Sequence, residues 1–185
     1  VISHELRTPL TSIRGSLGLL EGGVGGILSE DGHELVRIAR SNSERLIRLI
    51  NDILDLDKLE AGRLEFRNEL LSCSSLLNEA VLRSRKAAAD AGIALRVELP
   101  DSLPEAKGDP ERLLQVLLNL TANAIKFSSP NSEVTLRAAR GASGNLRIEV
   151  QDQGCGIPAS QQGRLFRKFQ QLESHTTRRS GGSGL

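Results

Sequence analysis

Apolar residues at helical spacing run through residues 1–61 and restrict this part of the chain to paired helices. One heptad-like seam advances by steps of three and four and is made of Leu6, Leu10, Ile13, Leu17, Leu20 and Val24. The segment 22–26 has four glycines in five positions and breaks the helix. A second seam with the same steps is made of Leu35, Ile38, Asn42, Leu46, Leu49, Ile53 and Leu56. The two runs predict an antiparallel helical hairpin over residues 1–62.

The ends of the second helix also carry signals. Ser29 or Asp31 can cap its start, and Gly62 stands where a C′ residue is expected. A hairpin of two helices buries only part of its seams, and pairing two copies into a four-helix bundle covers the rest. We therefore expect a homodimer formed through the hairpin.

From Arg63 onward the pattern changes to mixed strands and helices. Strands are predicted over residues 63–70, 93–99, 134–138 and 146–150, and helices over residues 75–91 and 110–127. The segment Asp109-Pro110-Glu111 is a strong helix start, with an acidic N-cap, proline at the first position and an acid in the first turn. After Val150 the chain is polar and glycine-rich, which predicts a long mobile loop with one short helix near 159–168. An α+β domain over residues 63–185 thus follows the hairpin, with a hinge near Gly62.

Composition narrows the class of protein. The 24 Lys and Arg residues balance 23 Asp and Glu residues, which argues against nucleic-acid binding through a general basic field. No apolar run approaches the roughly 20 residues of a membrane helix, so we expect no direct membrane contact in this fragment. Cys73 and Cys155 form no metal or disulfide motif, which indicates a reducing compartment. Because Val1 falls inside a helical run, we expect the chain to be a piece of a longer protein.

His4 is the first candidate for chemistry. It lies just beside the first seam, and a neutral imidazole is a good nucleophile. The adjacent Glu5 can bind one ring N–H, which leaves the lone pair of the other nitrogen free. Thr8 is four residues on, on the same helical face, where its hydroxyl can position a water. The alternative is a surface histidine without a functional role.

A second constellation stands in the helix predicted over residues 110–127. Asn119, Asn123 and Lys126 share one helical face, next to an apolar stripe of Leu113, Leu117, Leu120 and Ala124 that can pack on the sheet. An asparagine oxygen is a hard, neutral ligand suited to Mg²⁺, which takes its remaining ligands from phosphate and water. Lys126 can offset phosphate charge. The alternative is a helix with ordinary polar residues at its edge.

The segment after the last predicted strand reads D-x-G-x-G. The carboxylate of Asp152 can accept a hydrogen bond from the exocyclic amine of adenine. Gly154 and Gly156 have no Cβ, so the loop can pass close beside the base and adopt positive φ. By itself this pattern is also that of a turn after a strand.

The C-terminal segment combines aromatic residues with glycines. Phe166 and Phe169 occur in a stretch otherwise too polar for a core, and can anchor a loop that closes over a nucleotide. Gly182 and Gly184 can present backbone N–H groups to phosphate. The alternative is a disordered tail with a small hydrophobic cluster.

In this order, the segments resemble the motif series of bacterial sensor histidine kinases. The H, N, G1, F and G2 boxes of that family correspond to residues 2–10, 115–127, 152–156, 165–169 and 181–185. The resemblance implies an α-helical hairpin, residues 1–62, that forms a dimeric four-helix bundle for dimerisation and histidine phosphotransfer. It implies that the hairpin is followed by an α+β two-layer sandwich of the GHKL (Bergerat) ATPase type, residues 63–185, with an ATP lid at about 153–185.

The resemblance also implies roles for individual residues. His4 would be the phosphoacceptor, Glu5 its assisting base, and Thr8 would orient water for dephosphorylation of the partner. Asn123 would be the main Mg²⁺ ligand, with Asn119 on metal or phosphate and Lys126 on phosphate. Asp152 would bind adenine. The residues that would shape the rest of the ATP site are Gly154, Gly156, Phe166, Gly182 and Gly184.

The implied function is ATP-dependent autophosphorylation of His4 and phosphoryl transfer to an aspartate of a response-regulator receiver domain. Phosphatase activity toward that domain is a further implied activity. The implied protein is a cytoplasmic fragment of a membrane-anchored sensor. In this family the G2 motif usually continues with another Gly-Leu, and Thr is frequent where Ser183 stands. Two alternatives are a pseudo-enzyme that serves as a scaffold, and a fragment of a topoisomerase or chaperone ATPase. Those ATPases usually carry a Glu where this chain has Asn119.

Overall fold

The computed structural model describes residues 2–163 and 165 of the chain. The chain divides into two compact units, one that includes Val1–Leu64 and one that consists of Glu65–Ala159. None of the described helices is long and apolar enough to cross a lipid bilayer.

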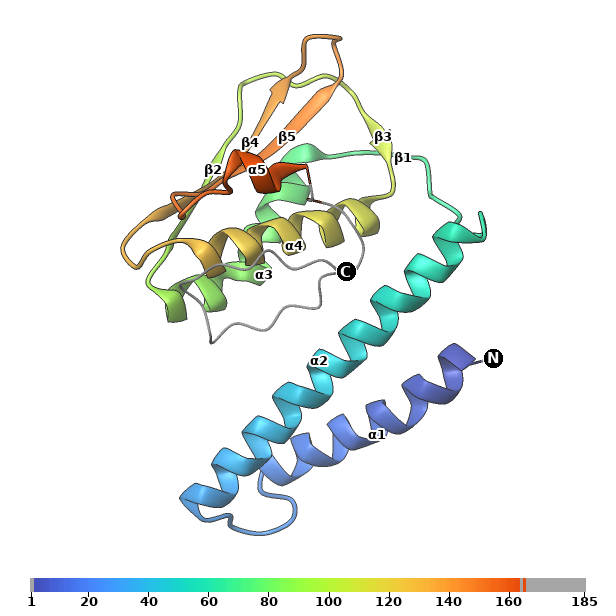
Figure 1. The fold of residues 1–185 in the computed structure, drawn as a ribbon, viewed down its shortest axis with the longest axis vertical. Helices are drawn as coiled ribbons and strands as arrows, with labels where there is room; N and C mark the ends of the chain where they lie inside the picture. Colours follow the sequence, from blue (N-terminus) through green and yellow to red (C-terminus); the bar gives the residue numbers. More distant parts are fainter. Residues whose placement is uncertain (1, 164, 166–185) are drawn as a thin grey trace. The chain divides into compact units, whose positions relative to one another are not determined.

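The helical unit is a hairpin of α1 (Ile2–Glu21) and α2 (Glu30–Glu60), which lie side by side (Figure 1). Ser29, rather than Asp31, caps α2, because its hydroxyl accepts a hydrogen bond from the backbone N–H of Gly32 at 3.2 Å. Gly62 follows the last helical turn with φ +64°, as a C′ residue does. Arg40 on α2 forms an ion pair with Glu21 at the end of α1. The predicted hairpin is therefore confirmed.

Helix α2 carries two apolar stripes side by side. The less exposed stripe is made of Val36, Ser43, Ile47, Ile50 and Leu54. It lies on the side of α2 from which Arg40 pairs with Glu21, so we infer that it is the side toward α1. The other, here named the open stripe, consists of Leu35, Ile38, Asn42, Leu46 and Ile53, whose aliphatic members are 67%, 47%, 45% and 48% exposed. The second predicted seam is thus largely not the face that meets α1. Val24 of the first seam lies in the turn after α1 and is exposed.

The mixed unit has a sheet with two helices on one face (Figure 1). The sheet contains β2 (Ala94–Glu98), β4 (Glu133–Arg140) and β5 (Leu146–Gln151) in the order β2-β4-β5. Strand β4 pairs with β2 in parallel and with β5 in antiparallel orientation. The helices are α3 (Cys73–Ala91) and α4 (Pro110–Phe127). The two-layer α+β architecture expected for this part of the chain is confirmed.

Three short elements complete the described strands and helices. Strand β1 (Glu69–Leu70) pairs with β3 (Lys107–Gly108), and α5 covers Ala159–Gln162. The strand predicted over residues 63–70 is therefore wrong for most of its length. Phe66, which the alternation placed on a half-buried face, is 62% exposed. The two-residue β3 was not predicted, since it is too short to show a period.

The core lies between the helices and the sheet. Leu77 of α3 and Val134 and Leu136 of β4 are fully buried. On α4 the buried residues are Leu117, Thr121, Ala124 and Ile125. The predicted apolar stripe included Leu120, which is 43% exposed, and missed Thr121, which is fully buried. Successive residues are about 100° apart around the helix, so Leu120 and Thr121 flank the line from Leu117 to Ala124 on opposite sides. The flank of Thr121 faces the core.

Candidate nucleotide and phosphotransfer sites

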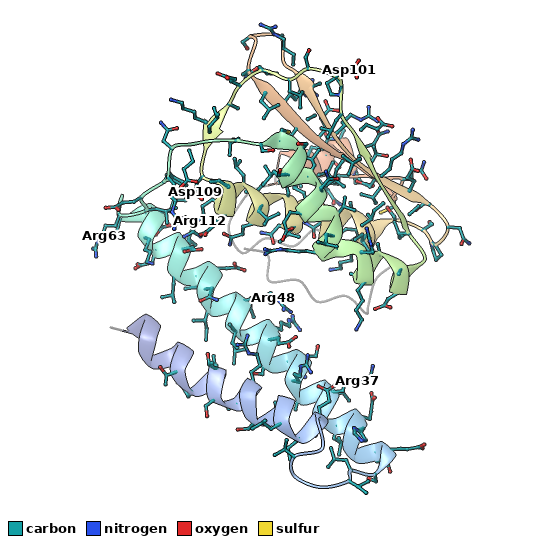
Figure 2. The ribbon with its side chains drawn as sticks, turned by 180° about the vertical axis from the view of Figure 1, so that it is seen from behind. Arg37, Arg48, Arg63, Asp101, Asp109 and Arg112 are labelled. Carbon is teal, nitrogen blue, oxygen red and sulfur yellow. The ribbon has the colours of Figure 1, made fainter. Side chains whose placement is uncertain are left out.

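The start of α4 is fixed by Asp109. Its carboxylate accepts hydrogen bonds from the backbone N–H groups of Glu111 and Arg112 at 3.1 Å each and of Arg67 at 3.2 Å. The bonds from Arg112 and Arg67 are the main reasons why the pKa of Asp109 lies below its ordinary value. Asp109 and Arg112 lie close together at this end of α4 (Figure 2). The predicted N-cap is confirmed, and it fixes where the following polar residues stand.

The polar face of α4 points away from the core. Asn119 and Asn123 are exposed, on the side of the helix opposite Leu117. Lys126 is half-buried, and its Nζ lies 5.0 Å from the centroid of the Phe127 ring, at the distance of a cation–π interaction. Two amide groups and one ammonium group thus share one face over the last turns of the helix. This is the donor set expected from the sequence.

Asp152 follows β5 directly and is exposed. Its Oδ1 accepts a hydrogen bond from the backbone N–H of Gly154 at 2.8 Å, so one carboxylate oxygen shapes the loop. The other oxygen, Oδ2, has no hydrogen-bond partner among the described residues. A carboxylate held in this way can accept a hydrogen bond from a ligand.

Gly154 brings the loop after β5 against the end of α4. It forms an isolated β-bridge with Ser128, the C-cap residue of α4. A Cβ added at Gly154 would lie 2.7 Å from the carbonyl oxygen of Phe127 and 2.8 Å from Oδ1 of Asp152. Any side chain would therefore separate the loop from the helix. This contact places Asp152 beside the end of α4 that carries Asn123 and Lys126.

Gly156 has a different requirement. Its φ of +68° lies in the left-handed region, and nothing is within 4 Å of an added Cβ. The loop thus needs glycine at this position for its backbone conformation and at Gly154 for close packing. Both glycines had been singled out in the sequence.

Two contacts of this loop were missed in the sequence. The side-chain Oε1 of Gln153 accepts a hydrogen bond from the backbone N–H of Glu133 at 3.2 Å, which ties the loop to the start of β4. Ser128 pairs with Gly154, and its buried hydroxyl has no hydrogen-bond partner in the described structure. No local pattern indicates either contact, because each joins residues far apart in the chain.

The residues expected to carry phosphotransfer lie on the hairpin. His4 and Glu5 fall within α1. Thr8 follows on the same helix and is exposed. The structure therefore places this group on one helix, as expected.

The expected lid lies only partly within the described residues. Phe166, Gly182 and Gly184 lie outside the described residues. Leu165, at the end of the described chain, is half-buried, and its N–H donates to the carbonyl oxygen of Gln162 at 3.1 Å.

Family models match most of the chain. Residues 1–62 match the family described as the His Kinase A (phospho-acceptor) domain. Residues 108–185 match the family described as the histidine kinase-, DNA gyrase B- and HSP90-like ATPase.

Alignments with related proteins extend over the full chain. The chain is 39% identical over 187 residues to the circadian input-output histidine kinase CikA of Synechococcus elongatus, and covers 24% of that protein. It is 34% identical over 189 residues to the signal transduction histidine-protein kinase BarA of Escherichia coli K12, and covers 20% of it. Both alignments include 100% of this chain. The chain thus spans about a quarter of these relatives or less.

Solved structures show the same fold. A crystal structure of full-length ShkA in complex with AMPPNP superposes with a TM-score of 0.77 at 31% identity, over 92% of this chain and 36% of that one. The histidine kinase AdeS of Acinetobacter baumannii gives a TM-score of 0.63 at 24% identity, over 90% of this chain and 79% of that one, and supports the fold alone. Together with the motif geometry, these matches show that the chain belongs to the sensor histidine kinases of two-component systems and forms their catalytic core.

Proposed function

We propose that this chain uses ATP to phosphorylate its own His4, and that the hairpin then passes the phosphoryl group to an aspartate of a response-regulator receiver domain. The observation that carries the proposal is the contact of Gly154 with Phe127 and Ser128. It joins the carboxylate expected to recognise adenine to the helix end expected to hold phosphate. Such an arrangement is suited to a nucleoside triphosphate.

Nucleotide recognition is assigned to the loop and to α4. Asp152 uses Oδ1 to hold Gly154 and offers Oδ2 to the exocyclic amine of adenine. Gly154 and Gly156 keep that space free of side chains and shape the pocket. Lys126 supplies positive charge to the phosphates, and moves from its place over the Phe127 ring to do so.

The residues present fit a magnesium ion. Mg²⁺ takes few protein ligands, prefers oxygen, and completes its shell with phosphate and water. The exposed amides of Asn123 and Asn119 lie on the face of α4 that also carries Lys126. Asn123 would be the main ligand, with Asn119 on the metal or on phosphate. When bound, the ion offsets the charge of the phosphates.

Phosphotransfer is assigned to α1. A ring nitrogen of His4 attacks the γ-phosphorus with its lone pair, the bond from that phosphorus to the β–γ bridging oxygen breaks, and ADP leaves with the electron pair. Glu5 holds the N–H of the other ring nitrogen and so keeps the attacking nitrogen unprotonated. In the second step a carboxylate oxygen of the receiver attacks the same phosphorus and the P–N bond breaks. Thr8 orients water when the receiver is dephosphorylated.

The remaining parts of the proposal concern assembly and context. The open stripe of α2 supports a homodimer formed through the hairpin, since it exposes four aliphatic side chains in the single chain. Residues 1–62 would be the dimerisation and phosphotransfer domain, and residues 63–185 the ATP-binding domain. Its lid would cover about 153–185 and include Phe166, Gly182 and Gly184. We place the fragment in the cytoplasm, as part of a membrane-anchored sensor.

The acceptor is tested with labelled ATP. The His4→Gln variant is expected to incorporate no acid-labile, base-stable phosphate, whereas His33→Gln should behave like the wild type, because His33 is an exposed histidine of α2. Incorporation that persists in the His4→Gln variant would refute the acceptor. A wild-type protein that binds ATP without forming phosphohistidine would favour the scaffold alternative.

The metal site is tested with a second pair of variants. Asn123→Ala is expected to abolish Mg²⁺-dependent phosphorylation, while Asn78→Ala on α3, also an exposed asparagine, should leave it unchanged. Unchanged activity of Asn123→Ala would remove the metal role.

A further inference from the structure

One polar residue interrupts the open stripe of α2. Asn42 stands between Ile38 and Leu46, and all other members of the stripe are Leu or Ile. It is exposed in the single chain, as are its aliphatic neighbours. If a second copy covers the stripe, Asn42 becomes buried with them. Its amide then needs partners.

The amide of Asn42 is only partly satisfied within its own helix. Its Nδ2 donates to the carbonyl oxygen of Ile38 at 3.0 Å. This bond uses one N–H and leaves the second N–H and Oδ1 without a described partner. Burial of these groups against aliphatic side chains is unfavourable, because a buried amide that loses water must find other hydrogen bonds.

A second Asn42 provides such bonds. Two amides are complementary to each other, because the Nδ2–H of each copy can donate a hydrogen bond to the Oδ1 of the other. This pairing forms only when two hairpins associate with equal residues at equal height. A shift by seven residues would place Asn42 against Leu35 of one helix or Leu49 of the other, both aliphatic. Without Asn42, the stripe would be uniformly aliphatic, and the loss of the amide pair would no longer oppose the shifted pairing.

We propose that Asn42 sets the register in which two hairpins of this protein pair, by hydrogen bonding of the two Asn42 amides across the symmetry axis of the dimer. The proposal depends on the homodimer described under the proposed function and adds the residue that specifies it. A single polar residue in an aliphatic helical interface fixes register at a cost in affinity. Replacement by Leu should therefore tighten the dimer and loosen its register.

Register can be measured as a distance between two copies. The full chain would carry Cys155→Ser, which removes the exposed native thiol, while the buried Cys73 stays. Arg37→Cys supplies a spin-label position on α2, because the Arg37 side chain is 69% exposed. With about 100° per residue, position 37 also lies on a different side of the helix from the open stripe. In an α-helix a shift of seven residues moves one label along the axis by about 10.5 Å. The two labels lie at equal height in the aligned dimer, so the shift lengthens the distance between them. Pulsed electron–electron double resonance measures that distance.

The expected results differ between four proteins. The protein with Asn42 unchanged gives one narrow distribution of label–label distances. The Asn42→Leu variant gives a broadened or bimodal distribution, and its dimer Kd is several-fold lower. Ser43→Ala is the matched control, since it removes a buried, unpartnered hydroxyl on the α1 side of the same turn, and should keep the narrow distribution. Leu46→Asn added to Asn42→Leu moves the amide by one turn along the stripe and should restore a single distance.

The outcomes separate this proposal from the one on which it depends. A wild-type chain that stays monomeric at all accessible concentrations overturns the homodimer. A wild-type dimer with an Asn42→Leu variant that keeps the single narrow distance overturns the register role alone. A double variant that remains broadened likewise counts against amide pairing.

Discussion

At the scale of single residues, the candidate ATP site depends on how closely two pieces of backbone approach. Gly154 lies so near the carbonyl of Phe127 that an added Cβ would be only 2.7 Å from it. Asp152 folds back on the N–H of Gly154 and uses one oxygen for that purpose. The position of the carboxylate that we assign to adenine binding is thus set by a residue without a side chain.

Alanine at Gly154 should therefore separate the loop from α4. We expect the affinity for ATP to fall by about tenfold or more, or about 1.4 kcal/mol, as the carboxylate of Asp152 moves away from the helix end. Titration calorimetry measures this effect. The control is Gly15→Ala on α1, where nothing lies within 4 Å of the new Cβ, so binding should be unchanged. Equal affinities of the Gly154→Ala variant and the wild type would contradict the assignment.

The cap of α4 predicts a pH dependence of stability. The pKa of Asp109 is lowered in the folded protein from an ordinary value of 3.8, chiefly by the N–H groups of Arg112 and Arg67. A lowered pKa means that the unfolded chain binds more protons, so this contribution to the free energy of unfolding is present above 3.8 and is lost as the pH falls through the folded-state pKa.

Thermal unfolding between pH 7 and pH 3 tests this effect. Asp109→Ala should lower the Tm near neutral pH, and the difference from the wild type should shrink below pH 3.8. Asp109→Asn keeps the cap acceptor and should lie close to the wild type. A Tm difference that is constant across the range would show that the charge of Asp109 contributes nothing.

At the scale of elements, two apolar faces of α2 differ in how far they are exposed in the single chain. Leu46 and Ile47 are neighbours in sequence, yet Leu46 belongs to the open stripe and is 45% exposed, whereas Ile47 belongs to the stripe against α1. Spacings of three and four residues occur in both stripes. The helical period therefore indicates that a face is apolar, but not which partner covers it.

Charged substitutions should separate the two stripes. Leu46→Glu is expected to raise the dimer Kd by about 100-fold or more, because two carboxylates would be buried in the interface, and to leave the hairpin helical. Ile47→Glu should instead lower the thermal stability of the hairpin itself. Sedimentation equilibrium and circular dichroism distinguish the effects. A Leu46→Glu protein with unchanged association would exclude the open stripe from the interface.

At the scale of the whole molecule, two units with separate cores should respond to different ligands. The mixed unit has its own core of α3, α4 and β4 residues, and the hairpin has its own apolar interface. A ligand that binds only the folded form stabilises the unit to which it binds, by about 2.7 kcal/mol at a concentration of 100 times Kd. Association through the hairpin stabilises the hairpin in the same way.

Calorimetry should therefore resolve two transitions with different dependences. Addition of Mg²⁺ and ADP is expected to raise the transition of the mixed unit and to leave that of the hairpin unchanged. Dilution should lower the transition of the hairpin only, because the proposed homodimer couples the folding of the hairpin to association. The Asn123→Ala variant is the control for the first effect. One common transition that shifts under both conditions would show that the two units unfold as one.

Sequence alone was sufficient for the hairpin, for α3, α4 and the three-stranded sheet and, through the resemblance of five motifs, for the family. These features are local, since a cap, a helical period or a D-x-G-x-G loop involves residues close in the chain. The roles of the candidate residues stay predictions. The tertiary structure decided which α2 stripe meets α1, that Thr121 rather than Leu120 is buried, and that Gly154 packs against Phe127 and Ser128. Each of these depends on a contact between segments far apart in the chain. A periodic pattern records that a face is apolar or polar, whereas only the folded chain determines what that face touches.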